Sequence, residues 1–105
     1  MITEKITLPD GIEYNGTMHR DMEIRPQKVR DSVEAMENER AQNNNAYLGL
    51  AVLAGQTLRL GTIPKDQITA DLLMELSEDD MNEINSGLER LRNRVQSFRA
   101  ENKGR

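Results

Sequence analysis

The sequence predicts an α+β fold, mostly helical, in which a small N-terminal β-hairpin or meander precedes three to four helices. Two observations lead to this prediction. Up to residue 25, apolar residues alternate with polar ones, as in strands with one buried face, whereas after Pro26 they recur every three or four residues, as on a helix. With 105 residues, 36% of them hydrophobic, the chain is long enough for one modest core, so we expect a single domain.

Two turn signals divide the β region, which spans residues 1–25. Pro9-Asp10-Gly11 separates two short alternating segments, which predicts a hairpin, and Asn15-Gly16 is a second two-residue turn. A third strand over residues 17–24 would extend the hairpin to a meander. Its register is open, because Arg20 interrupts the run of apolar residues on one parity.

The helical region spans residues 27–100 and begins with an amphipathic helix that carries Val29, Val33 and Met36. We expect Met36 and Met74 to fill the core. Asn43-Asn44-Asn45 then either ends this helix or forms an exposed turn, and residues 46–54 are the most apolar segment, which predicts a central helix.

Two more segments complete the helical region before the last helix. Gly55, Gly61 and Pro64 break the apolar pattern into a loop, and a short helix is expected near residues 69–76. Residues 101–105 are expected to be a frayed polar tail.

The last helix is long and carries a heptad-like seam. It is expected to start at Ser77, with Asp80 three residues later completing a capping box. Six apolar residues then recur at intervals of three and four, the spacing of a helix that docks against another helix: Met81, Ile84, Leu88, Leu91, Val95 and Phe98. Burying such side chains is worth roughly 1.5 to 3 kcal/mol each, so another surface must cover the seam.

The sequence is compatible with two surfaces against which the seam could be buried. The seam could pack on the helix over residues 46–54 of the same chain, or it could contact another molecule, including a second copy. Because a helix of about ten residues is too short to cover it all, Leu91, Val95 and Phe98 are the expected partner contacts, with Arg92 and Arg99 as charged rim.

The composition argues against catalysis and against metal or cofactor binding. The chain has no cysteine and one histidine, and it has neither a glycine-rich phosphate loop nor a recognisable pair of nucleophile and base. We interpret His19 as a solvated surface residue, and the acidic run at residues 78–83 as helix-start electrostatics in preference to a calcium site. The N-terminus does not have the pattern of a signal peptide, and residues 46–54 are too short to span a bilayer.

The charge is uneven along the chain. Residues 1–87 hold 8 Lys/Arg and 16 Asp/Glu, whereas residues 88–105 hold 6 and 2. A basic tail raises the possibility of nucleic-acid binding, but the net charge is -4 and the tail contains a single aromatic residue for base stacking. A solvated helix end or a protein-docking rim is the preferred interpretation.

The order of these pieces resembles the Mu-like family of bacteriophage tail assembly chaperones. The resemblance rests on the Ile-Thr-Leu-Pro-Asp-Gly segment at residues 6–11, on Ile24-Arg25-Pro26, on Lys28-Val29-Arg30-Asp31 and on the stretch from residue 72 to residue 91. The chain departs from the family pattern in its longer hairpin region, residues 15–23, and in its three consecutive asparagines.

The resemblance implies a small, non-catalytic protein of the host bacterial cytoplasm. Proteins of this family bind the tape measure protein, the helix-rich ruler of the tail, and keep it soluble until tail tube subunits polymerise around it. The tape measure protein is therefore the expected partner and the tail tube protein a second one. A small DNA-associated regulator that uses the basic tail is the alternative, and a structural tail component is a third possibility.

Overall fold

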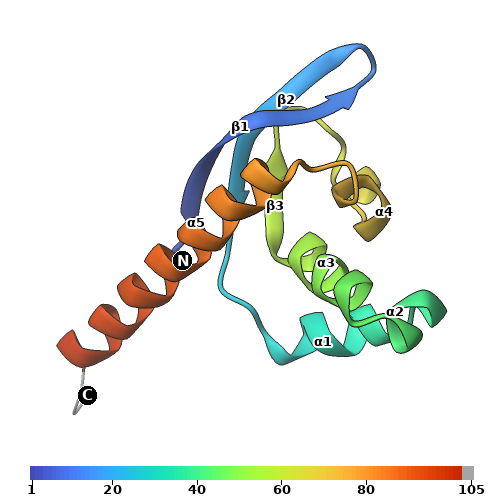
Figure 1. Cartoon of the computed structure of the whole chain (residues 1–105). Coiled ribbons are helices and arrows are strands. Elements are labelled where there is room, and N and C mark those ends of the chain that lie inside the picture. Colours follow the sequence, from blue (N-terminus) through green and yellow to red (C-terminus); the bar gives the residue numbers. More distant parts are fainter. Residues whose placement is uncertain (103–105) are drawn as a thin grey trace.

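Three antiparallel strands form one sheet in the computed structural model, which describes residues 1–102 (Figure 1). The strands are β1 (Glu4–Tyr14), β2 (Thr17–Ile24) and β3 (Thr57–Leu60), in the order β1-β2-β3. Asn15 and Gly16 form the turn between β1 and β2 with φ of 51° and 78°, so this predicted turn is confirmed. Positive φ at both central residues is typical of the type I′ turn, whose twist matches that of the strands.

The strand β1 is continuous, and the predicted turn at residues 9–11 is wrong. The pairing of β1 with β2 shifts between Thr7 and Ile12, so Pro9 and Gly11 lie in a bulge instead of a hairpin turn. Gly11 has a φ of 84°, and a Cβ there would come within 2.5 Å of the His19 carbonyl oxygen. Because the inter-strand hydrogen bonds are interrupted at a bulge, a proline there costs none of them. The strand can therefore continue through these residues without reversing direction.

The third strand is β3, and it lies inside the region predicted to be helices and loops. Residues 57–60 pair with β2, with Leu60 opposite Met22 and Glu23 opposite Arg59. A four-residue strand gives almost no periodicity of its own, and its partner lies more than thirty residues away. The prediction of a loop here is therefore wrong for residues 57–60, which form a strand.

The helices of residues 1–102 follow the predicted order, but there are five α-helices where three to four were expected, because the first expected helix ends at Met36 and a separate short helix follows it. They are α1 (Val29–Met36), α2 (Glu39–Asn43), α3 (Asn45–Gln56), α4 (Ala70–Leu73) and α5 (Glu78–Glu101), with a 3-10 turn at Lys65–Gln67. The polar interruption ends α2, and the Asn44 side chain caps α3 by accepting a hydrogen bond from the Tyr47 N–H. Of the predicted tail, Glu101 ends α5 and residues 103–105 lie outside the described residues.

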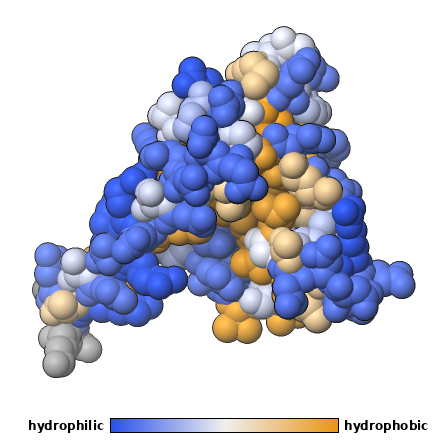
Figure 2. All heavy atoms as spheres, viewed as in Figure 1, coloured by the Kyte–Doolittle hydropathy of each residue, from blue (hydrophilic) through white to orange (hydrophobic). Residues whose placement is uncertain are grey.

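The apolar side of α1 faces outward, contrary to expectation. Val29 is 82% exposed, and Val33 and Met36 are exposed as well, so the prediction that Met36 fills the core is wrong. Met74, which follows α4, is also exposed, so the prediction that it fills the core is wrong as well. The buried positions of α1 are Asp31 and Ala35. Figure 2 shows the resulting orange surface at the lower edge of the molecule, where Figure 1 places α1.

Candidate functional site

The start of α5 is fastened to the bulge of β1. Ser77 and Asp80 form the predicted capping box: the Ser77 hydroxyl accepts from the Asp80 N–H, and the Asp80 carboxylate accepts from the Ser77 N–H. The same buried carboxylate also accepts from the N–H groups of Asp10, at 2.9 Å, and Gly11, at 3.1 Å. This acidic residue therefore serves helix-start electrostatics, as predicted, and it also fixes where α5 leaves the sheet.

The seam of α5 divides into two rows that face different neighbours. Ile84 and Leu91 belong to the main core, and Phe98, seven residues further on, borders a depression with Ile2. Met81 and Leu88 line the space next to α3, and Val95, seven residues after Leu88, lines its continuation beside Gln56 and the linker before α1. A repeat of seven residues drifts little on a helix, so each row keeps one direction over the length of α5. The sequence showed one stripe because the two rows are only three or four residues apart.

The sheet-facing row packs mainly on β1, which corrects the expectation that α5 packs on the helix over residues 46–54. Ile84 and Leu91 are 0% and 3% exposed within the main core. Between them Gly87 approaches Ile6 so closely that a Cβ on the glycine would lie 2.5 Å from the isoleucine Cδ1. Leu91 is thus a core residue, and the prediction that it faces a partner is wrong.

Phe98 belongs to neither the core nor the α3 side. It is 54% exposed and borders a depression together with Ile2 and Arg94, beyond the end of β1. The prediction that Phe98 shares one face with Val95 is therefore also corrected. Of the three expected anchors, Val95 alone lines the space between α5 and α3 without being buried.

The arginines of α5 are divided in the same way as the seam. Arg90 and Arg94 both bind the Glu4 carboxylate, each with an N–O distance of 2.8 Å. The hydrogen bond from Arg90 is the main reason why the pKa of Glu4 lies below its ordinary value, and Arg94 adds to it while partial burial opposes it. These two arginines fasten α5 to β1.

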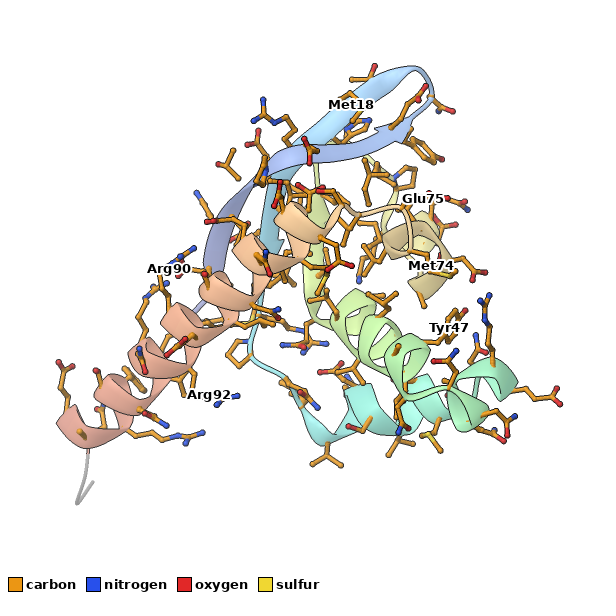
Figure 3. The ribbon with its side chains drawn as sticks, viewed as in Figure 1. Met18, Tyr47, Met74, Glu75, Arg90 and Arg92 are labelled. Carbon is orange, nitrogen blue, oxygen red and sulfur yellow. The ribbon has the colours of Figure 1, made fainter. Side chains whose placement is uncertain are left out.

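Arg92 and Arg99 are not used in this way. Within residues 1–102 neither guanidinium forms a salt bridge. Figure 3 shows Arg90 and Arg92 leaving α5 on opposite sides, with Arg92 directed toward the linker that precedes α1. The two free cations are therefore on the α3 side of α5, next to the row that contains Val95.

An elongated groove, which we call the α3–α5 groove, separates the two helices. Its proximal part, about 410 Å³, is bordered by apolar residues of both helices, and its distal part, about 380 Å³, lies between α5 and the linker before α1. Gln27, Gln56 and Leu88 border both parts, so the groove is continuous. The proximal part is lined by Leu50, Val52, Leu53 and Met81, and the distal part by Leu91, Arg92, Val95, Gln96 and Arg99. Of these residues Leu53 and Leu91 are buried, whereas the others are at least partly exposed.

The wall opposite α5 is held in place by an ion pair whose carboxylate is buried and whose guanidinium is partly exposed. Arg25 donates to both oxygens of Asp31, at 2.8 and 3.0 Å, and to the carbonyl oxygen of Gly55 at 2.8 Å. The hydrogen bond from Arg25 is the largest reason why the pKa of Asp31 lies below its ordinary value. Because the pair joins the end of β2 to α1 and α3, it keeps both at a fixed place relative to the sheet.

His19 is buried, so its interpretation as a solvated surface residue is wrong. It is 8% exposed; its Nδ1 accepts from the Thr62 N–H, and its Nε2 lies 3.3 Å from the Tyr14 carbonyl oxygen. Gly61, with φ of 55°, lies against the imidazole ring. The histidine therefore holds the turn after β3 against the hairpin, a role that depends on long-range pairing and leaves no local sequence signal.

Residues 1–102 contain neither a metal-binding cluster nor a membrane-spanning helix. No three His, Asp or Glu side chains come together there as metal ligands, and no helix in that span has the length and apolar composition needed to cross a membrane. Comparisons with protein-family models, with curated proteins and with solved structures found no match.

Proposed function

We propose that the chain is a tail assembly chaperone of a Mu-like bacteriophage, which binds the tape measure protein in the host cytoplasm before the tail tube forms. The resemblance of residues 6–11, 24–31 and 72–91 to that family suggests this role. The observation that carries it is the α3–α5 groove, an apolar trough between two helices with free arginines at one end.

The groove suits a helical client for a physical reason. An amphipathic helix laid between two helices buries its apolar side against both walls, which is a common way for a folded protein to hold a helical segment. Residues 81 to 99 of α5 extend over about 27 Å at the rise of an α-helix, enough for a client helix of several turns. A tape measure protein is rich in such helices, and the chaperone would cover their apolar sides until assembly.

The same geometry argues against the DNA-binding alternative. Arg90 and Arg94 are bound to Glu4, so the basic tail offers fewer free cations to phosphate than the sequence suggests. The single aromatic residue of the tail, Phe98, is on a different side of α5 from Arg92 and Arg99. We therefore retain the chaperone as the proposed function, with tail tube subunits as a second partner.

Co-expression with the tape measure protein of the same phage tests the proposal. The client should be soluble with the wild-type chain and should aggregate without it. Val95→Asp should lose this protection, because a carboxylate would enter the groove, whereas Phe98→Asp should keep it. A client that aggregates beside a folded wild-type chain would refute the proposed function, and full protection by a folded Val95→Asp variant would remove the groove from it.

A further inference from the structure

The two free arginines of the α3–α5 groove indicate which charge its binding partner should have. Every residue that borders the groove within residues 1–102 is apolar, uncharged polar or arginine, and no carboxylate is among them. Arg92 and Arg99 are the cations of this lining, and both are in its distal part. The groove thus has an apolar proximal part and a positively charged distal part.

This arrangement is not a general feature of the basic tail. Arg90 and Arg94 have equally long side chains on the same helix, yet both are neutralised by Glu4. If the arginines served only to hold α5 on the sheet, those beside the groove would have an intramolecular carboxylate too. They do not have one within residues 1–102.

We infer that the occupant of the α3–α5 groove is an acidic amphipathic helix, whose apolar side lies on the proximal part and whose Asp or Glu side chains pair with Arg92 and Arg99. The inference rests on the proposed function and specifies the client segment by its chemistry. Arginine suits this task because its planar guanidinium can bind a carboxylate through two parallel hydrogen bonds. Complementary charge at the rim of an apolar contact sets orientation and excludes wrong partners.

The two arginines would also distinguish between client helices of equal hydrophobicity but different charge. A helix with the same apolar side but with Lys in place of Glu would place like charges beside the two arginines, which suppresses binding. A tape measure protein presents many amphipathic helices along its length. The charge of the groove would therefore direct the chain to the acidic ones.

Two synthetic peptides of about 18 residues test this directly. They share one leucine stripe and differ only in carrying Glu or Lys on the flanks. Binding to the wild-type protein is measured by fluorescence anisotropy at low salt. We expect the acidic peptide to bind about tenfold more tightly than the basic one, because two exposed ion pairs replace two repulsions. Higher salt should reduce the difference.

Paired variants assign the preference to the groove. Arg92→Glu with Arg99→Glu should abolish or reverse the preference for the acidic peptide. Lys5→Glu with Arg30→Glu changes the net charge equally at exposed positions outside the groove lining, and should keep the preference. Circular dichroism verifies that both double variants are folded.

The outcomes are separable from those of the co-expression experiment. Equal affinity for the two peptides, or a preference that survives Arg92→Glu with Arg99→Glu, would overturn the inference even if the client is kept soluble. Failure of the acidic peptide to bind would overturn it as well. The proposed function itself falls only if the wild-type chain leaves the tape measure protein insoluble.

Discussion

Asp80 shows how one residue can serve two elements at once. Its carboxylate caps α5 and accepts from two N–H groups in the bulge of β1. The capping role is visible in the sequence, as Ser77 followed by an acidic residue three positions later. The second role depends on a bulge that the sequence presents as a turn, so no local pattern points to it.

Replacing Asp80 should therefore cost more than the loss of a helix cap. Asp80→Ala leaves the buried N–H of Gly11 without its acceptor, and we expect the free energy of unfolding to fall by about 2 to 4 kcal/mol. Asp79→Ala, an exposed neighbour in the same helical turn, should cost less than about 1 kcal/mol. Urea unfolding of the two variants provides the comparison, and equal losses would contradict this role of Asp80.

The ion pair of Arg25 and Asp31 should appear in the pH dependence of stability. The pKa of Asp31 in the folded protein is below its ordinary value of 3.8, chiefly because of the hydrogen bond from Arg25. The ionised Asp31 therefore stabilises the folded protein fully above about pH 4. This stabilisation is lost as the pH falls through the lowered pKa of Asp31 in the folded state.

The substitution Asp31→Asn tests this. It should cost about 3 to 5 kcal/mol at pH 7, because it leaves Arg25 without its counter-ion, and the difference from wild type should shrink below about pH 4. Urea unfolding at a series of pH values measures it. A difference that stays constant from pH 7 to pH 3 would show that the pair is not responsible.

At the scale of elements, the sequence predicts what local periodicity encodes. The helical order, the Asn15-Gly16 turn and the start of α5 all follow from short patterns, and all are confirmed. The strand β3 and the bulge of β1 depend on pairing with β2, a long-range interaction that has no local signal. For the same reason the seam of α5 could be found but its division into two rows could not.

Replacing glycine by alanine should have opposite effects at two helical positions, because only one of them lies in the contact between α5 and β1. Gly49→Ala in α3 meets nothing within 4 Å and should stabilise the protein by up to about 1 kcal/mol, since alanine is the better helix former. Gly87→Ala should instead destabilise it by about 1 kcal/mol, because the new methyl group displaces Ile6 in the core. Thermal unfolding of both variants decides this, and stabilisation by Gly87→Ala would mean that α5 is not held as closely to the sheet.

At the scale of the whole molecule, an open apolar groove predicts self-association when no client is present. Apolar surface of this kind commonly pairs with a second copy, and a symmetric dimer is the usual result. We expect light scattering to report species larger than a monomer at high micromolar concentration, and Val95→Asp to shift them toward the monomer. A wild-type chain that stays strictly monomeric there would contradict this prediction.

Photo-cross-linking in cells can determine whether the proposed client helix lies in the α3–α5 groove. A photoreactive residue is placed at position 95, inside the groove, or at position 98, on the other side of α5, in cells that also make the tape measure protein. We expect a covalent product with the tape measure protein from position 95 and none from position 98. Cross-linking from position 98 alone would contradict it.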